Sequence, residues 1–217
     1  MIGSTLLARA SRRADVSDAA PARRPVLGYR QRPGAAQGTA LWVFMGVVTA
    51  LFSLFLVAYV MRLSANDATA ITLPWQLWLS TTWLLAGSAA LQRASGLSRR
   101  GRPAQRPLLI GGACALGFIA SQSWAWMALL GAQVSLTGNP AGSFFYLLSL
   151  LHGLHVAGGV VAWGLVLRAL RHAPATAAWR IALCARYWHF LLLLWLGLFS
   201  AFSVITPDLA AAICGTR

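Results

Sequence analysis

Two histidines stand three residues apart in a stretch of the chain that is otherwise almost entirely apolar. The stretch 144–167 reads FFYLLSLLHGLHVAGGVVAWGLVL and contains His152 and His155. Burying a polar group in such a stretch costs free energy unless the group forms a hydrogen bond or another polar contact. Imidazoles can ligate metals, transfer protons or form hydrogen bonds. Because helical positions three apart are neighbours, we expect both rings to point the same way, near the middle of a helix.

Four roles for these imidazoles can be compared. A haem would need an axial ligand from a facing helix, and His189 is expected to match neither ring in depth without a stagger of the helices. A metal would need further N, O or S ligands, yet the chain has no Glu and no Asp within an expected helix core. A proton relay would need more titratable groups. We therefore favour hydrogen bonding between helices, with no haem, copper or other cofactor and no metal ligand in this chain.

Other chemistries have weaker support in the sequence. An intramembrane serine–histidine pair could use Ser88 or Ser149, but no nucleophile motif accompanies either serine. Cys114, Cys184 and Cys214 are scattered, which argues against a disulfide framework and against CxxC metal sites. We expect no catalytic residue in this chain.

The composition places the protein in a membrane. Hydrophobic residues make up 58% of the 217 residues and charged residues only 10%, which is too apolar for an ordinary soluble domain. All 18 basic residues are Arg, against four Asp. The Arg residues lie between apolar segments and form no single patch. They therefore predict anchoring at an anionic membrane surface, and not nucleic-acid binding.

Five apolar segments predict an all-α integral membrane bundle of five transmembrane helices. A helix of about 19–26 residues crosses a bilayer core of about 30 Å. A single segment can cross only as a helix, because a helix forms all its backbone hydrogen bonds within itself. The predicted helices are 41–63, 74–92, 107–132, 143–167 and 182–205. Residues 1–40 are expected to form a basic, disordered tail, with an organellar transit peptide as the alternative. Residues 206–217 would form a short C-terminal tail.

The placement of Arg predicts the orientation of the bundle. Seven Arg precede the first segment, the second connection holds five, and four lie in the fourth connection or the first turns after it. The first and third connections hold none after Arg62, and the C-terminal tail has only Arg217. This alternation predicts a cytoplasmic N-terminus and an outer C-terminus. Arg62 would then end the first helix on the outer side, where it could reach lipid head groups.

A set of small, aromatic and polar residues is expected to hold the helices together or to contact another subunit. Small residues let helix backbones approach closely in lipid, and Gln122 is expected at the same depth as His152. The set comprises His152, Gly153, His155, Gly158, Gly159, Gln122, Tyr187, Trp188, His189 and Trp195. Hydrogen bonds of this kind in lipid contribute on average about 0.6 kcal/mol each.

Four of the five segments carry motifs that resemble one protein family. LLHGLHVAGGVVAW, residues 150–163, resembles the HGLHV–GG helix of subunit III of the haem-copper oxidases, and RYWHFLLLLWLGLF, residues 186–199, resembles that family's YWHF…W helix. Residues 41–62 resemble its first common helix, and FIASQSWAWMAL, residues 118–129, resembles its helix with a Gln and paired aromatic residues. The motifs occur in the family's order over residues 41–205.

The resemblance implies the five-helix form of a non-catalytic subunit. Such a subunit packs beside subunit I, in a complex that also contains subunit II, and holds phospholipids. Haem and copper would lie in those partner subunits. The complex would serve aerobic electron transport, reducing oxygen and translocating protons. A bacterial inner membrane is favoured over a mitochondrial one. The alternatives are an accessory subunit of a nitric oxide reductase of the same family and a small membrane transporter.

This chain departs from the family at three acidic positions. The family usually has acids where this chain has Val48, Ala125 and Leu192. Their absence weakens a carried-over role in proton uptake and indicates a divergent member.

Overall fold

The computed structural model describes residues 34–63, 73–132, 140–172, 174–206, 209–210 and 212. The chain divides into two units, 1–32 and 33–217, and every described residue belongs to the second. The tail predicted over 1–40 overlaps the described residues only from Gly34 onward, where residues from Ala35 are already helical. Its other part, and most of the predicted C-terminal tail, lie outside the described residues.

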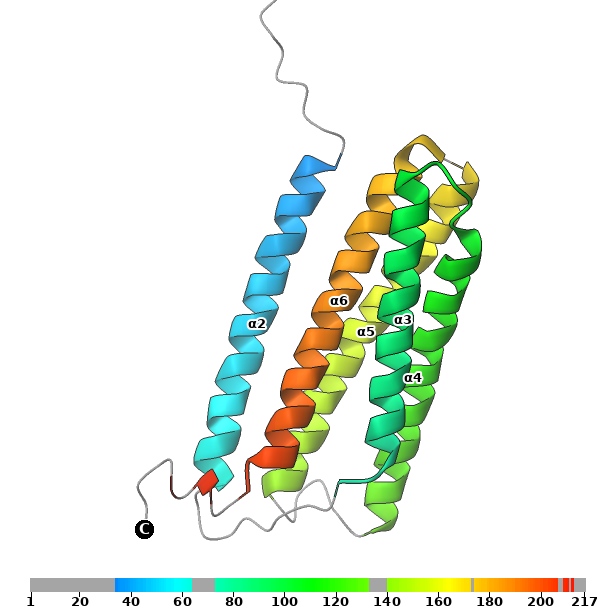
Figure 1. Cartoon of the computed structure of the whole chain (residues 1–217). Coiled ribbons are helices and arrows are strands. Elements are labelled where there is room, and N and C mark those ends of the chain that lie inside the picture. Colours follow the sequence, from blue (N-terminus) through cyan, green and yellow to red (C-terminus); the bar gives the residue numbers. More distant parts are fainter. Residues whose placement is uncertain are drawn as a thin grey trace, which may run out of the picture. The chain divides into compact units, whose positions relative to one another are not determined.

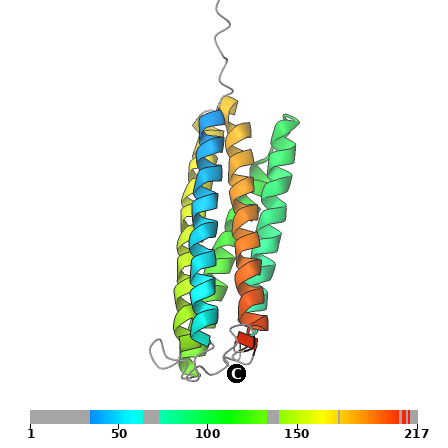
Figure 2. The ribbon, with the colours of Figure 1, turned by 90° about the vertical axis from the view of Figure 1, so that its left-hand side faces the viewer.

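The described residues form five α-helices and no strand (Figure 1). These helices are α2 (Ala35–Leu63), α3 (Gln76–Arg99), α4 (Gln105–Gly131), α5 (Pro140–His172) and α6 (Pro174–Val204). Helix α3 packs against α4 and α6, and α5 packs against α4 and α6. Helix α2 packs only against α5 and α6 within the described part, and Figure 2 shows it beside these two.

Four of the five helices, α2, α4, α5 and α6, are long and apolar enough to cross a membrane. The protein is therefore an integral membrane protein. Helix α3 does not meet that standard because polar side chains lie along its buried face, among them Gln76, Ser80, Thr81 and Ser88. Helix α3 can carry these groups because α4 and α6 cover that face and supply partners, such as the Ser121 hydroxyl for that of Ser80, at 2.9 Å.

The helices extend beyond the predicted apolar segments, mostly at one end. Helices α2, α4 and α6 begin there and α3 and α5 end there, at Arg99 and His172 (Figure 1). We call this the basic end, and its Arg residues are Arg93, Arg99, Arg100, Arg102, Arg106, Arg168, Arg171, Arg180 and Arg186. Arg, Ala and Gln are good helix formers, so the backbone stays helical after the apolar run has ended. A criterion based on hydrophobicity misses these turns.

Helix α6 supplies the largest buried side chains of the core. Trp188, Leu191 and Trp195 are almost completely enclosed, and Phe118 of α4 and Leu84 of α3 face the same core. Ring contacts join these helices, for example between Phe118 and Trp195 with centroids 5.4 Å apart. The core therefore lies where α3, α4 and α5 meet α6.

Candidate functional site

The two histidines of α5 point toward different helices. His152 contacts Phe118 of α4 and Trp195 of α6, with ring centroids 5.6 Å and 5.3 Å away. His155 contacts Phe44 and Phe52 of α2, with centroids 6.0 Å and 5.7 Å away. The expectation that both rings point the same way is therefore wrong. Three residues advance a helix by less than a full turn, by about 300°, and here that difference separates two neighbours.

His152 is enclosed by aromatic rings. Its side chain has no exposed surface, and neither ring nitrogen has a hydrogen-bond partner among the described residues. Gln122 of α4, expected as a partner, is also buried, and both of its amide atoms lack partners in the same part of the chain. The two side chains therefore do not form the hydrogen bond that their matching depth suggested.

His155 makes its hydrogen bond within its own helix. Its Nδ1–H donates to the carbonyl of Leu151 at 2.7 Å, because a carbonyl can only accept. The hydroxyl of Tyr187, on α6, donates to the carbonyl of His155 itself at 3.0 Å. Tyr187 and His155 are thus brought together, through the backbone of α5.

Val48 occupies the place opposite His155. It is buried, and it stands one helical turn from both Phe44 and Phe52, the two rings that contact His155. Ala125 is completely buried and Leu192 is half-buried. Two of the three positions that lack the expected acid therefore lie in closed apolar surroundings, where a carboxylate would need a partner.

His189 connects α6 to α3. Its Nε2–H donates to the amide oxygen of Gln92 at 3.0 Å, so its Nδ1 accepts from the hydroxyl of Ser88. Ser88 is 3% exposed and lines none of the cavities described below, so we interpret this serine–histidine contact as a packing contact. Ser88 was considered as the serine of a serine–histidine pair without a specified histidine, and Gln92 was not predicted. Their spacing of four residues, which puts both on one face of α3, was the available signal.

The aromatic candidates of α6 lie in the core. Trp195 donates its Nε1–H to the hydroxyl oxygen of Thr81, on α3, at 2.9 Å. Trp188 is 1% exposed, and its Nε1 lacks a hydrogen-bond partner among the described residues. Thr81 was not predicted, since a threonine within an apolar helix gives no sign of which helix it faces.

The three candidate glycines of α5 differ in their surroundings. A Cβ on Gly159 would lie 3.3 Å from side-chain atoms of Leu191 and Tyr187, so α6 approaches the backbone of α5 there. A Cβ on Gly153 or Gly158 would have nothing within 4 Å. Only Gly159 has the close helix contact expected of all three. A contact of Gly153 and Gly158 with another subunit stays a prediction.

We expect Gly159→Leu to destabilise the bundle and Gly158→Leu to leave its stability almost unchanged. The larger side chain at 159 would push α6 away, at a cost of about 1–3 kcal/mol, whereas position 158 opens onto a cavity. Equilibrium unfolding of the two purified variants in mixed micelles would measure the difference. Equal losses in both variants would show that α6 does not approach α5 at Gly159.

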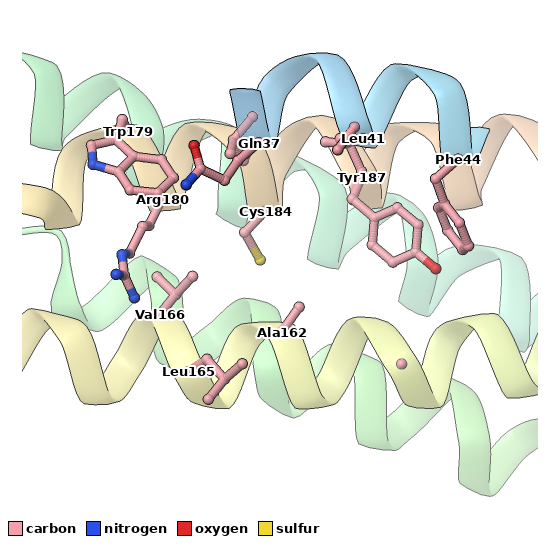
Figure 3. Close-up of a pocket in the computed structure, with 13 residues that line it drawn as sticks. Gln37, Leu41, Phe44, Ala162, Leu165, Val166, Trp179, Arg180, Cys184 and Tyr187 are labelled. Atoms are coloured by element: carbon pink, nitrogen blue, oxygen red, sulfur yellow. The ribbon is translucent and has the colours of Figure 1, made fainter. Parts of the chain in front are cut away.

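A large cavity lies between α2, α5 and α6 near the basic end, with a volume of about 690 Å³. Figure 3 shows its lining residues, which include Phe44 of α2, Ala162 of α5 and Tyr187 of α6. Most of the wall is apolar. Its polar side chains include Gln37, Trp179 and Arg180. The indole Nε1–H of Trp179 and the guanidinium Nε–H of Arg180 are buried and have no acceptor among the described residues. The cavity thus combines an apolar wall with unused hydrogen-bond donors at one end.

Metal ligation has no preassembled group among the described residues. No three side chains of the types His, Cys, Asp and Glu come together there. Cys114 and Cys184 are buried as free thiols. The prediction that this chain binds no cofactor remains a prediction.

The chain is similar over part of its length to bacterial proteins that carry one name. No family model matches the chain. It is 35% identical over 86 residues to a protein of Nocardia farcinica named "Probable cytochrome c oxidase subunit 3", which covers 38% of this chain and 42% of that protein. A protein of the same name from Mycobacterium tuberculosis is 34% identical over 88 residues, 39% and 43% of the two chains. Cytochrome c oxidase subunit 3 of Corynebacterium diphtheriae is 30% identical over 84 residues, 38% and 41% of the two chains. The matches therefore span about two fifths of the length of these curated relatives.

Proposed function

We propose that the chain is a member of the haem-copper oxidase subunit III family and serves as a non-catalytic subunit of a bacterial terminal oxidase. The single observation that carries the proposal is its similarity to bacterial proteins named cytochrome c oxidase subunit 3. In this proposal it packs against subunit I in the bacterial inner membrane and stabilises the complex. The complex reduces oxygen and translocates protons, and subunits I and II hold the haem and copper.

The surroundings of the histidines support a packing role. His152 lies against two aromatic rings and His155 donates to its own helix. His189 is shared between Ser88 and Gln92 of α3. Each imidazole therefore contacts neutral groups of neighbouring turns or helices. Such contacts fix the positions of helices and do not by themselves transfer electrons or protons.

The proposed topology places all five helices across the membrane. Helix α3 lies between α4 and α6 along its length, so it would cross with them although its composition is less apolar. Every Arg of the basic end lies at one end of the helices, which supports a cytoplasmic position for that end and for the N-terminus. The C-terminus would then lie outside. Labelling of single cysteines at 101 and 206 by a membrane-impermeant reagent in intact cells tests this, with label expected only at 206.

Affinity purification of the full chain in a mild detergent tests the proposed function. We expect a large haem-bearing membrane subunit to co-purify, with oxygen-reducing activity and a Soret band that the isolated chain lacks. A colourless assembly of this chain alone would contradict the proposal and favour a transporter. A haem-bearing partner that reduces nitric oxide but not oxygen would favour the accessory subunit of a nitric oxide reductase.

We further propose that the cavity between α2, α5 and α6 holds a phospholipid of the cytoplasmic leaflet. Its apolar wall suits an acyl chain, and the unused N–H groups of Trp179 and Arg180 suit phosphate oxygens at the basic end. Arg62 lies at the opposite end of α2, exposed, where it suits a head group of the outer leaflet.

Replacing Arg180 with leucine should lower the retention of an anionic phospholipid about tenfold, since a charge-assisted hydrogen bond contributes about 1.5–3 kcal/mol. Native mass spectrometry of the purified chain with dioleoyl phosphatidylglycerol measures this retention. Arg93→Leu is the matched control, because Arg93 is exposed on α3 and lines no part of this cavity. Equal retention by both variants would remove Arg180 from the proposed site.

A further inference from the structure

A second cavity lies at the opposite end of the helices from the basic end. Its volume is about 290 Å³, and α2, α3, α5 and α6 all contribute to its wall. It is lined by Tyr59, Leu63, Leu73, Trp78, Ala141, Phe145, Phe199, Phe202, Ser203, Ile205 and Thr206. No lining residue is charged, so the cavity suits a neutral molecule.

Tyr59 is the enclosed polar side chain of this cavity. Its side chain is only 4% exposed, and its ring packs between Phe144 and Phe202, with centroids 5.9 Å and 5.6 Å away. No hydrogen bond to its hydroxyl occurs among the described residues, and the residue lines the cavity. Buried tyrosine hydroxyls usually find a partner. The hydroxyl is therefore a donor available to whatever enters the cavity.

The other hydroxyl groups of the wall are already engaged. Ser203 donates to the carbonyl of Phe199 at 2.7 Å, and the hydroxyl oxygen of Thr206 accepts from the backbone N–H of Leu209 at 3.4 Å. Ser203, Thr206 and Trp78 are exposed, so Tyr59 carries the one enclosed donor of the wall, and an entering molecule would offer it a hydrogen-bond acceptor.

Aromatic rings form much of the wall. Phe145 packs against Phe202 with centroids 5.1 Å apart, and Trp78 meets Phe199 edge-on at 4.9 Å. Trp78 is 66% exposed, so it stands between the cavity and the surroundings of the bundle. Ring edges and faces of this kind favour a compact apolar group, and above all a flat one.

We propose that this cavity binds a neutral apolar molecule whose carbonyl oxygen accepts a hydrogen bond from the Tyr59 hydroxyl. Two sources supply this chemistry in a membrane. One is the carbonyl of a flat ring, as in a quinone or an aromatic ketone, and the other is the ester carbonyl of a lipid chain. The site is independent of the proposed oxidase function, since it is built from this chain alone.

Equilibrium dialysis of the purified full chain against duroquinone tests the ring carbonyl. This quinone is fully methylated and therefore does not add to the cysteine thiols. We expect saturable binding that weakens about tenfold in Tyr59→Phe, which removes only the hydroxyl. Tyr146→Phe is the matched control and should bind as the wild type does, because Tyr146, a buried tyrosine of α5, lines neither this cavity nor the one between α2, α5 and α6. Ala141→Leu should abolish binding by filling the cavity.

Native mass spectrometry of the same variants, taken from phospholipid nanodiscs, tests the lipid ester. A retained phospholipid that Tyr59→Phe loses and Tyr146→Phe keeps would assign the site to a lipid chain. The proposal is overturned if duroquinone binding is absent or insensitive to Tyr59→Phe and no phospholipid depends on Tyr59. In that case water alone satisfies the hydroxyl.

Discussion

Replacing Trp195 with alanine should cost the bundle about 3–5 kcal/mol of unfolding free energy, the range found for large aromatic side chains removed from closed cores. The indole has no exposed surface and contacts Phe118, His152 and Phe199, which belong to α4, α5 and α6. Its removal would leave a cavity at the point where these helices meet. Equilibrium unfolding in mixed micelles would measure the loss.

The same substitution also breaks a hydrogen bond between helices. The Nε1–H of Trp195 donates to the hydroxyl oxygen of Thr81, which itself donates to the carbonyl of Leu77 within α3. Trp195→Phe would remove this bond and keep most of the ring volume, so it should cost much less, about 1 kcal/mol. The comparison separates the contribution of packing from that of the hydrogen bond.

Trp124→Ala serves as the control for the loss of a tryptophan as such. Trp124 is 46% exposed on α4, and we expect its replacement to cost less than about 1 kcal/mol. Similar losses at the two positions would mean that α6 does not form the centre of the core.

The five-helix architecture was predictable because it follows from the spacing of apolar residues. Runs of apolar residues bounded by Arg and Pro mark helices whether or not their neighbours are known. The ends were less predictable, since the helix signal continues past the apolar run. Helix α6 begins at Pro174, well before the predicted start at residue 182. Helix α3, the second predicted segment, is harder to assess as a membrane span because its polar side chains are partnered by neighbouring helices that the sequence does not identify.

The environment of each candidate residue was less predictable than its position. Spacing put His152 and His155 on one side of α5, but only the packing of α2 on that helix separates them. Depth matched Gln122 to His152, yet depth does not specify which way a side chain points. His189 was recognised without its partners Ser88 and Gln92, because a pairing between helices depends on their rotation.

Helix rotation also decides which glycines matter. The glycines of α5 were predicted as close-contact positions because they follow the histidines, but the glycine with the least room for a Cβ lies on α4. A Cβ added to Gly112 would overlap the indole ring of Trp163, which crosses from α5. Gly112 stands in an ordinary apolar helix and carries no motif. Without knowing that a tryptophan faces it, the sequence gives no reason to single it out.

Gly112→Ala should therefore destabilise the protein by about 3 kcal/mol, although alanine is the better helix former. In an open helix the change stabilises by up to about 1 kcal/mol. Here the Trp163 ring cannot easily withdraw, because its Nε1–H donates to the carbonyl of Leu108 at 2.8 Å, one turn before Gly112. Accommodating a methyl group means breaking that hydrogen bond or separating α4 from α5.

Gly164→Ala provides a control of opposite sign, since a Cβ there would have nothing within 4 Å. It should leave the unfolding free energy unchanged or raise it slightly. The double variant Gly112→Ala with Trp163→Phe should recover part of the loss, because the smaller ring vacates the notch at Gly112 and no longer needs the Leu108 carbonyl. Two results would mean that Trp163 does not occupy the notch. One is a Gly112→Ala protein as stable as the wild type. The other is a double variant that loses more unfolding free energy than the two single variants together. The contact between α4 and α5 would then have to be made elsewhere.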